Sequence, residues 1–307
     1  MSAGTERTSV ASCPYPQRRT LYRLLTPLET DPSLFEPDQL ARRIDALDEL
    51  DFLIGSLGSA PSNTSIHARA IALRARIEAA NAALYASIRQ EIQHGAQPHA
   101  VLRWIHSGSA PERPAPDLNP APGLSYDRRD EIVSGILELQ EPAHADHSLD
   151  SEMVFYQPTP VRHILALIAA GALGEDDLLV DLGSGLGHVS LLASILSGCS
   201  SLGIEVDGSY VASAQACARI LCLSRVRFIE GDARTADLSG GTVYYLYTPF
   251  TGSMLSDVLG RLRSEGTKRA FRVCTLGPCT SAVAQEPWLT AASAPDSEQI
   301  TVFRTRS

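Results

Sequence analysis

One run of residues, 178–188 (LLVDLGSGLGH), constrains the fold of this chain more than any other. Its apolar first half predicts a short buried strand, its glycines predict a tight turn, and a helix is expected to begin near Gly187. A turn of this kind brings backbone N–H groups and a helix N-terminus close to a bound ligand. The run therefore predicts a nucleotide-type cofactor site, and the alternative is an ordinary glycine-rich turn.

Two residues of this run favour one class of cofactor. The dinucleotide-binding fingerprint needs a small residue at the position of His188, where helix and strand pack closely. Asp181 is expected at the carboxyl end of the strand, where its charge would repel a pyrophosphate and attract a sulfonium or an α-amino group. S-adenosyl-L-methionine carries both of these cations and no phosphate. The sequence therefore favours S-adenosyl-L-methionine over NAD.

Strand and helix patterns alternate after this run. Strands are expected at Ser200–Glu205, Val226–Glu230, Val243–Tyr247 and Ala270–Leu276, a helix at Gly208–Leu223, and a final antiparallel pair at Trp288–Ala292 and Gln299–Arg304. This alternation predicts a parallel, doubly wound sheet whose ligands bind outside the carboxyl ends of its strands. Glu205 and Asp232 are expected at those ends. Glu205 follows the glycine turn by about twenty residues, as an acceptor for ribose hydroxyls should.

With these motifs, residues 150–307 resemble the class I S-adenosylmethionine-dependent methyltransferases. They are most similar to the non-SET histone lysine methyltransferases of the disruptor-of-telomeric-silencing type, which share the VDLGSG-x-G run, an Asp after a Gly in the third acidic motif, and a turn matching Tyr247–Gly252. Residues 152–161 match the loop that these enzymes fold over the cofactor. The resemblance implies an α/β fold, a Rossmann-like seven-stranded methyltransferase sheet with a helical N-terminal region.

The resemblance also implies a set of site residues. Those expected to bind the cofactor are Tyr156, Gln157, Thr159, Asp181, Gly183, Ser184, Gly185, Gly187, Glu205, Val206, Asp232, Ala233, Tyr247 and Thr248. Tyr156 and Tyr247 are the candidate catalytic residues. Tyr247 and Thr248 replace two asparagines of the family, and the chain has no lysine-rich nucleosome-binding tail. The fold and the cofactor therefore carry over, whereas the histone substrate does not.

Residues 155–157 (FYQ) have two interpretations. They form either a lid whose rings exclude water from the cofactor, or only the lead-in to a helix at Val161–Ala170. For that helix, Thr159 is the expected N-cap and Pro160 the expected first helical residue. A lid suits methyl transfer, because positioning and desolvation can supply much of the acceleration of an in-line displacement.

Composition restricts the partners. The net charge is −9 and Lys268 is the only lysine, which argues against nucleic acid, since its binding needs clustered basic residues. No apolar run reaches the roughly eighteen residues of a membrane span, and residues 1–10 have no apolar core of a secretory signal. The protein is therefore expected to be cytoplasmic, without nucleic-acid or membrane partners.

No metal site is expected, because the six cysteines include no C-x-x-C pair. Cys217 and Cys222, on a predicted buried helix, and Cys274, on a predicted strand, are expected to be small core residues in a reducing compartment. His144 and His147, with Glu141, resemble a set of metal ligands, but a polar connecting loop is the favoured interpretation. His163 and His188 could each face the cofactor pocket, but a hydrogen-bonded structural histidine is the favoured interpretation of both.

The first part of the chain, residues 1–107, is expected to be a separate helical region. Apolar residues at helical spacing predict helices at Pro37–Leu57, Ser65–Gln93 and Gln97–His106. Five prolines within 108–123 predict a stiff linker, and a helix at Tyr126–Leu139 opens the methyltransferase domain at 124–307. The N-terminal helices are either a stabilising appendage or homodimer face, or a cap that selects the substrate.

Two classes of function remain open. The acids at the strand ends favour a methyltransferase that acts on a small-molecule or peptide acceptor, with protein lysine methylation of the non-SET type as an alternative. The other class is a non-catalytic S-adenosylmethionine-binding module. The sequence identifies no general base. Strand alternation places Tyr245 and Tyr247 on one face of their strand and Tyr244 on the other.

Overall fold

The computed structural model describes residues 23, 25–56, 64–95, 97–107, 125–142 and 156–306. The chain divides into two compact units, Met1–Leu84 and Tyr85–Ser307. This division falls within a long helix, upstream of the linker predicted at 108–123, which lies outside the described residues. The boundaries predicted at residues 107 and 124 therefore stay predictions.

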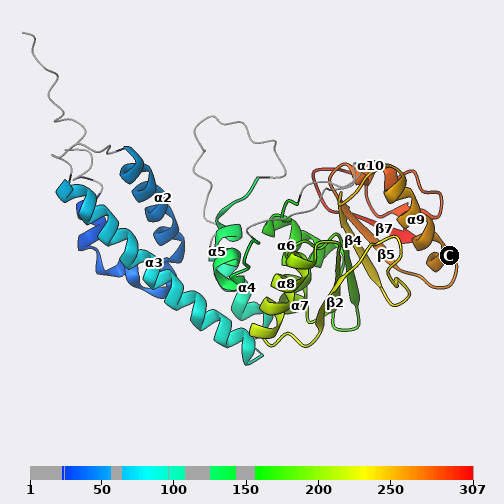
Figure 1. The fold of residues 1–307 in the computed structure, drawn as a ribbon, viewed down its shortest axis with the longest axis horizontal. Coiled ribbons are helices and arrows are strands. Elements are labelled where there is room, and N and C mark those ends of the chain that lie inside the picture. The colour runs from blue at the N-terminus through cyan, green and yellow to red at the C-terminus, as the bar shows by residue number, and fades with distance from the viewer. Residues whose placement is uncertain are drawn as a thin grey trace, which may run out of the picture. The chain divides into compact units, whose positions relative to one another are not determined.

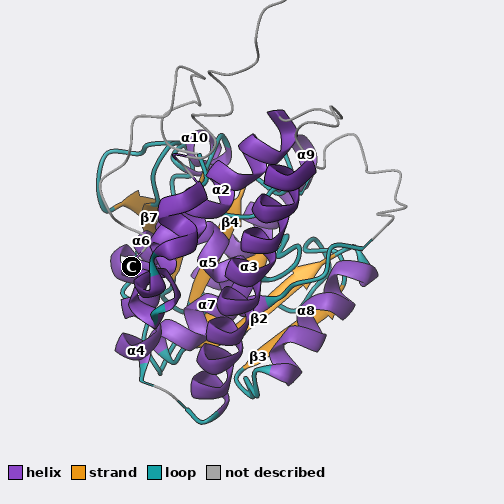
Figure 2. Cartoon of the chain, turned by 90° about the vertical axis from the view of Figure 1, so that its left-hand side faces the viewer, coloured by secondary structure: helices purple, strands orange, loops and turns teal. Residues whose placement is uncertain are grey.

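The N-terminal unit is helical. Two short 3-10 helices, η1 (Pro32–Phe35) and η2 (Pro37–Gln39), lead into α2 (Leu40–Ser56), which lies beside α3 (Thr64–Gln93) in both Figure 1 and Figure 2. A common core contains Leu50, Leu53, Ile66, Leu73 and Ile77. Both long helices predicted here are confirmed. The first begins three residues later than predicted, because Pro37 starts a separate 3-10 turn.

The second unit continues from the end of α3 into a group of shorter helices. These are α4 (Pro98–Ser107), α5 (Arg128–Leu137) and α6 (Val161–Ala170), and their predicted positions are confirmed within a few residues. Asp127 caps α5, because its side chain accepts a hydrogen bond from the N–H of Arg129. Asp130 completes a capping box by accepting from the N–H of Asp127.

The start of α6 differs from the prediction. Pro160, and not Thr159, is its N-cap residue, and it supplies no side-chain bond to the first turn. The N–H of Val161 is satisfied instead by the carboxylate of Asp130 on α5. The hydroxyl of Thr159 lies 3.1 Å from that of Tyr245. Capping rules consider only residues near the helix start, so they could not predict that Asp130, on another helix, caps α6.

The sheet of the second unit has seven strands. They are β1 (Leu178–Leu182), β2 (Ser200–Glu205), β3 (Val226–Glu230), β4 (Val243–Tyr247), β5 (Arg272–Leu276), β6 (Leu289–Ala291) and β7 (Thr301–Thr305). Their order is β3-β2-β1-β4-β5-β7-β6, with β7 antiparallel to both of its neighbours. The predicted fold class, a seven-stranded Rossmann-like sheet with a helical N-terminal region, is confirmed.

Helices cover both faces of this sheet (Figure 1). α6, α7 (His188–Ser197) and α8 (Gly208–Ile220) lie on one side, and α9 (Gly252–Gly266) and α10 (Cys279–Val283) lie on the other. The core beneath α9 and α10 includes Val180, Leu182, Tyr244, Leu246, Val258, Leu262 and Phe303. α9 and α10 were not predicted from the sequence. None of the helices in the described part of the chain is long and apolar enough to cross a membrane.

The cysteine predictions are confirmed in part. Cys217 and Cys274 are buried, as expected for small core residues. The prediction for Cys222 is wrong, because α8 ends at Ile220 and Cys222 follows it, exposed and in the left-handed region at φ 56°. His144 and His147 lie outside the described residues.

The sheet order places a crevice at the carboxyl end of β1. β1 pairs with β2 on one side and with β4 on the other, and the connections leave these strands toward opposite faces of the sheet. In open α/β sheets, ligands bind at such a switch point. The loops that follow β1, β2, β3 and β4 therefore meet around one site.

Candidate active site

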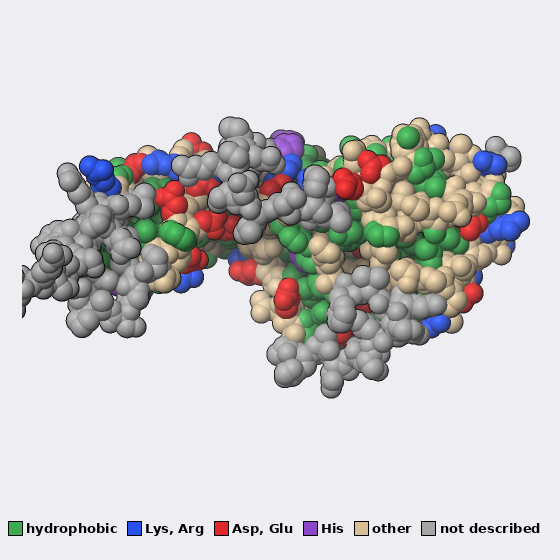
Figure 3. Space-filling view, turned by 90° about the horizontal axis from the view of Figure 1, so that it is seen from above, with side chains coloured by type: hydrophobic (Ala, Val, Ile, Leu, Met, Phe, Trp, Pro, Cys, Tyr) green, Lys and Arg blue, Asp and Glu red, His purple; other side chains and the backbone are tan. Residues whose placement is uncertain are grey.

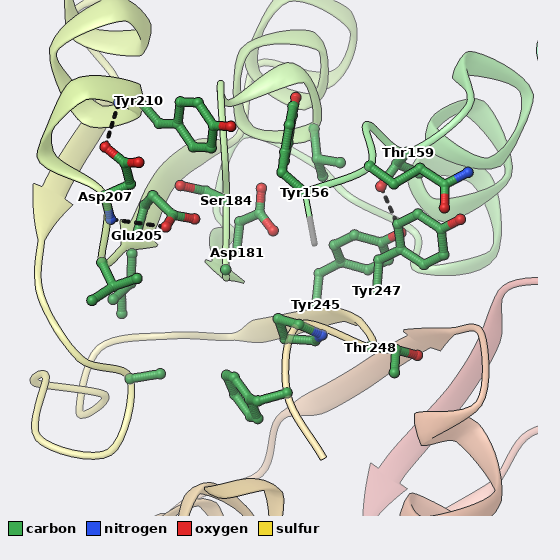
Figure 4. Close-up of a pocket in the computed structure, with 18 of the residues that line it drawn as sticks. Tyr156, Thr159, Asp181, Ser184, Glu205, Asp207, Tyr210, Tyr245, Tyr247 and Thr248 are labelled. Atoms are coloured by element: carbon green, nitrogen blue, oxygen red, sulfur yellow. Dashed lines mark hydrogen bonds between the residues drawn. The ribbon is translucent and has the colours of Figure 1, made fainter. Parts of the chain in front are cut away.

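A pocket of about 320 Å³ lies at this switch point (Figure 4). Its lining is Tyr156, Gln157, Pro158, Thr159, Asp181, Gly183, Ser184, His188, Val189, Ile204, Glu205, Val206, Asp207, Tyr210, Gly231, Asp232, Ala233, Tyr245, Tyr247, Thr248, Pro249, Phe250, Met254 and Pro278. The acids from β1 and β2 occupy one end and the tyrosines of β4 the other, with Tyr156 between them. The volume falls at the lower end of the range for small-ligand sites.

The glycines after β1 allow the chain to turn closely around this pocket. Gly183 and Gly185 have φ values of 80° and 51°, which disfavour any side chain. A Cβ atom on Gly183 would lie 2.4 Å from Cβ of Pro249, and one on Gly185 would lie 2.0 Å from the ring of Tyr156. Gly185 and Gly187 were predicted to bind the cofactor, but neither lines the pocket. Gly187 packs instead against Phe228.

Asp181, at the end of β1, is the most deeply buried acid of the site, with 3% of its surface exposed. Burial, and then the nearby charge of Glu205, raise the pKa of its carboxyl group to about 7. A hydroxyl contact with Ser190 at 3.5 Å opposes this rise only weakly. Because no lysine or arginine lines the described pocket, a cationic ligand would be the natural partner of this carboxylate.

Glu205 ties the loop after β2 to the glycine turn. Its Oε2 accepts a 2.8 Å hydrogen bond from the N–H of Gly185, and its Oε1 accepts one of 3.0 Å from the N–H of Asp207. Each carboxylate oxygen can accept a further hydrogen bond, so Glu205 remains able to hold ligand hydroxyls. Asp207 in turn caps α8 by accepting from the N–H of Ser209 at 2.8 Å.

Asp232, after β3, is held differently from the other acids. Its carboxylate accepts hydrogen bonds from the guanidinium of Arg234, at distances from 2.7 to 3.1 Å, and from the N–H of the same residue. These bonds lower the pKa of Asp232. The side chain is therefore ionised and fixed at the edge of the pocket, next to Ala233.

Tyr156 covers the middle of the pocket. Its hydroxyl lies 3.1 Å from Nδ1 of His188, and its ring contacts that of Tyr210 at 5.0 Å between centroids. Burial lowers the pKa of His188 to about 4, so the imidazole is neutral near pH 7. Burial also raises the pKa of Tyr156. A neutral pair of side chains thus holds the Tyr156 ring in place.

The far end of the pocket is built on β4 and the turn after it. Tyr245 and Tyr247 line the pocket, whereas Tyr244 lies in the core on the opposite face, as strand alternation predicted. Thr248 has a φ of 41°, which is a strained conformation for a β-branched residue. Its hydroxyl donates to the carbonyl of Leu276 at 3.2 Å and accepts from the N–H of Cys279 at 3.1 Å. These two bonds hold the strained turn at the pocket.

The structure brings most of the predicted site residues together. All of them line the pocket except Gly185 and Gly187, and Gln157 is exposed at its edge. Phe155 of the predicted lid lies outside the described residues. The roles assigned to these residues stay predictions.

Asp207 and Tyr210 also line the pocket but were not predicted from the sequence. His188 lines it as well, which was the less favoured of its two interpretations, and it is also hydrogen-bonded, to Tyr156. A pattern typical of a helix N-cap follows β2, at Asp207-Gly208-Ser209. This pattern could have indicated Asp207 and Tyr210. In the described part of the chain, no cluster of three or more His, Cys, Asp or Glu side chains could hold a metal ion.

The pocket fits S-adenosylmethionine on two observations. The buried carboxylate of Asp181 suits a sulfonium or an amino group. The hydroxyl of Ser184 is buried and has no hydrogen-bond partner among the described residues, so a ligand can satisfy it. In such a complex, Glu205 would hold the ribose and Asp232-Ala233 the adenine edge.

Comparison with known proteins gives one family match. Residues 151–227 match the model of the family described as histone methylation protein DOT1. This segment contains the residues before α6, the glycine turn, and the strands β1 and β2 with their helices. No curated protein matches the chain.

Several solved structures are similar to part of the chain. An RNA methyltransferase from Salinibacter ruber, in complex with S-adenosyl-L-homocysteine, is 27% identical, with a TM-score of 0.39, over 48% of this chain and 92% of that chain. A precorrin-6y C5,15-methyltransferase from Geobacter metallireducens is 13% identical, with a TM-score of 0.38, over 50% and 92%. A tRNA (uracil-54, C5)-methyltransferase from Pyrococcus abyssi is 14% identical, with a TM-score of 0.37, over 49% and 39%.

The family match confirms the resemblance found in the sequence, and the sheet order confirms the fold class. The match covers only residues 151–227, so it does not extend to the N-terminal unit or to the strands after β3. With the acids placed at the ends of β1, β2 and β3, the second unit is an S-adenosylmethionine-dependent methyltransferase domain of the class I fold that resembles the DOT1 family.

Proposed function

We propose that this protein transfers a methyl group from S-adenosylmethionine to a small-molecule or peptide acceptor. The observation that carries the proposal is the division of one pocket into two parts. The acids of β1 and β2 lie at one end, Tyr245 and Tyr247 of β4 form an uncharged, aromatic end, and Tyr156 lies between them. The acidic part suits the cationic portion of the cofactor, and the outer part of the aromatic end, at Tyr247, suits the acceptor.

The residues near the aromatic end restrict the acceptor. When bound, S-adenosylmethionine supplies a methyl group on a cationic sulfur. Burial raises the pKa of Tyr156, Tyr245 and Tyr247, so these hydroxyls stay protonated near neutral pH. His188, with its pKa lowered to about 4, is a weak base. The proposed acceptor therefore presents a lone pair that needs no strong base, and the site contributes by binding, orienting and excluding water.

Charge supports a small or peptidic acceptor over a nucleic acid. The net charge of the chain is −9. On the face of the molecule shown in Figure 3, the Lys and Arg side chains of the described residues are scattered among acidic ones and form no broad basic patch. Nucleic-acid binding depends on such patches, because it neutralises several phosphates at once.

Protein lysine methylation is the second candidate. The match of residues 151–227 to the histone methylation family favours it. A lysine side chain would fit an aromatic site, since tyrosine rings attract ammonium groups. Tyr247 and Thr248 occupy the positions of two family asparagines, which weakens this candidate. The third candidate is a module that binds S-adenosylmethionine without catalysis.

One labelling experiment separates these candidates. The full chain is incubated with S-adenosylmethionine labelled in the methyl group and, in separate reactions, with a small-molecule extract, a mixed peptide library, nucleosomes and RNA. Asp181→Asn is the matched control, because it removes the charge and keeps the shape. We expect Asp181-dependent labelling of a small molecule or a peptide. Labelling of nucleosomal histone or RNA alone would contradict the proposal, and cofactor binding without any labelled product would favour the binding module.

We also propose a reducing compartment such as the cytoplasm. Cys199, Cys217, Cys222, Cys274 and Cys279 are all free thiols in the described structure. Free cysteines are usual where the environment keeps thiols reduced. Fractionation of the host cell with an antibody to the protein tests this proposal, and recovery from an oxidising compartment would contradict it.

A further inference from the structure

Two buried hydroxyl groups face each other in the wall of the pocket. Oγ1 of Thr159 lies 3.1 Å from the hydroxyl oxygen of Tyr245, and the bond is drawn in Figure 4. Thr159 is 7% exposed and Tyr245 is 1% exposed, yet both line the pocket. Thr159 comes from the lead-in to α6, and Tyr245 comes from β4. The pair therefore joins two walls of the site.

This pair has one hydrogen to spare. Each hydroxyl group carries a single hydrogen, and the bond between them uses only one of the two. Among the described residues, neither hydroxyl has another hydrogen-bond partner. Burial raises the pKa of Tyr245 well above its usual range, so its hydroxyl keeps its hydrogen at neutral pH. Whichever group donates within the pair, the other can donate to a ligand.

The position of the pair along the sheet indicates which part of the ligand it meets. Tyr245 on β4 is the register partner of Asp181 on β1. Glu205 lies on β2, on the other side of β1. A ligand with its ribose at Glu205 and its cationic part at Asp181 would thus extend its remaining atoms toward Tyr245. For S-adenosylmethionine, these atoms belong to the amino-acid portion.

The acidic lining of the pocket means that the amino-acid portion of S-adenosylmethionine needs a neutral hydrogen-bond donor. S-adenosylmethionine carries an α-carboxylate beside its amino group. The lining includes the acids Asp181, Glu205, Asp207 and Asp232, and none of the described lining residues is a lysine or arginine. A carboxylate in this pocket must therefore be bound by N–H or O–H groups, because an unpaired buried charge is strongly unfavourable.

We propose that the Tyr245–Thr159 pair binds the α-carboxylate of the cofactor, with Tyr245 as a binding residue that the family motif does not supply. The inference rests on the proposed methyltransferase function, and it adds a residue to the cofactor site. It also explains why a tyrosine hydroxyl lies fully buried on the pocket face of β4. Tyr247, two residues further on, is only partly buried and remains available to the acceptor.

Two ligands that differ only in the amino-acid portion provide the test. S-adenosylhomocysteine carries this portion, and 5′-methylthioadenosine has the same adenosine and thioether without it. Affinities of both are measured by calorimetric titration of the full chain. For Tyr245→Phe, the Kd of S-adenosylhomocysteine should rise roughly tenfold or more, as expected for a hydrogen bond to a charged group. The Kd of 5′-methylthioadenosine should stay within about twofold.

Two further variants complete the design. Thr159→Val should produce the same selective loss, and the double variant should lose little more than either single one, because the two hydroxyls act together. Tyr244→Phe is the matched control, since it removes a hydroxyl from the same strand on the opposite face, where it contacts Arg269. This control should leave both affinities unchanged.

The outcomes separate this inference from the function on which it rests. If the wild-type protein binds S-adenosylhomocysteine and Tyr245→Phe binds it equally well, the inference is wrong and the cofactor assignment stands. If Tyr245→Phe weakens the binding of S-adenosylhomocysteine and of 5′-methylthioadenosine equally, the hydroxyl supports the shape of the pocket and does not bind the carboxylate. If the wild-type protein binds neither ligand, the proposed function fails as well.

Discussion

Asp130 Oδ1 accepts a 2.7 Å hydrogen bond from the N–H of Val161, so a carboxylate from α5 caps α6. Oδ2 of the same residue accepts a 2.6 Å bond from the N–H of Asp127. One side chain therefore satisfies the first turns of two helices. The hydroxyl of Tyr126 adds a 2.8 Å bond to the carbonyl of Pro158. Residues 125–130 thus support the pocket wall that contains Tyr156 and Thr159.

Loss of the Asp130 carboxylate should affect both stability and binding. We expect Asp130→Ala to lower the free energy of unfolding by about 1–2 kcal/mol, the usual effect of losing a helix cap. Because the pocket wall loses its support, affinity for S-adenosylmethionine should also fall. Urea unfolding and calorimetric titration measure the two effects. Asp257→Ala, an exposed acid of α9, is the control and should change neither.

Asp181 should make cofactor binding dependent on pH. Its pKa is raised to about 7 in the ligand-free pocket, and a cationic ligand favours the ionised form. The affinity for S-adenosylmethionine should therefore fall as the pH drops from 7 to 5, by up to about tenfold per pH unit, and level off above about pH 8. Titrations across this range measure the slope. In Asp181→Asn, affinity should be weak and the slope should disappear; an equal slope in that variant would contradict the assignment.

The same carboxylate should destabilise the ligand-free protein at neutral pH. A carboxyl group whose pKa is raised on folding stabilises the native state most at low pH, and this contribution is lost as the pH rises from about 4 to about 7. Asp181→Asn should therefore become more stable than the wild type as the pH rises, by on the order of 4 kcal/mol at most. Paired urea melts at pH 5 and pH 8 measure the difference, and a gap that does not grow with pH would speak against a buried, ionised Asp181.

Glu205 should contribute to cofactor affinity through the ribose. Hydrogen bonds to a charged group contribute roughly 1.5–3 kcal/mol each, so Glu205→Ala should raise the Kd of S-adenosylmethionine at least tenfold. The structure adds a second cause, because Glu205 also holds the N–H groups of Gly185 and Asp207. Asp257→Ala, which removes an exposed acid of α9 that does not line the pocket, is a suitable control. Calorimetry that shows equal affinity for Glu205→Ala and the wild type would remove Glu205 from the site.

Tyr156 should act through its ring more than through its hydroxyl. Tyr156→Phe loses the contact with His188 but keeps the ring that lies against Gly185, so turnover should fall by only about threefold, the effect of a weak neutral hydrogen bond. Tyr156→Ala opens the pocket to water and should reduce turnover at least tenfold. Initial rates with the acceptor identified by labelling measure both. Equal effects of the two substitutions would contradict a covering role for the ring.

The parts of the fold that depend on local pattern could be predicted from the sequence. The strands β1 to β5 lie within two residues of the positions that the sequence predicts, and the glycine turn and the acids at the strand ends locate the pocket. The ends of the predicted elements were less accurate. The helix expected to continue to Leu223 is α8, which ends at Ile220 because the chain turns at Cys222, where φ is 56°. A positive φ at a non-glycine residue leaves no signal in the sequence.

The remaining features depend on partners far apart in the chain. Thr159 has the residue type and position of an N-cap residue. Its hydroxyl, however, forms a hydrogen bond with the hydroxyl of Tyr245, and Asp130 caps α6. His188 begins α7 and acquires its role only when Tyr156 packs over it. α9 carries apolar residues at helical spacing, including Met254, Leu255, Val258 and Leu262, and this signal could have been used. Contacts between distant residues could not be derived from spacing alone.

The most direct test of the central claim is a calorimetric titration of the full chain with S-adenosylmethionine and with NAD at pH 8, repeated with Asp181→Asn. We predict a single site for S-adenosylmethionine in the wild type, a Kd at least tenfold higher in the variant because a charge-assisted contact is lost, and no binding of NAD. Binding of NAD instead of S-adenosylmethionine, or equal affinity for S-adenosylmethionine in the two proteins, would contradict the claim that the acids of this pocket hold a cationic cofactor.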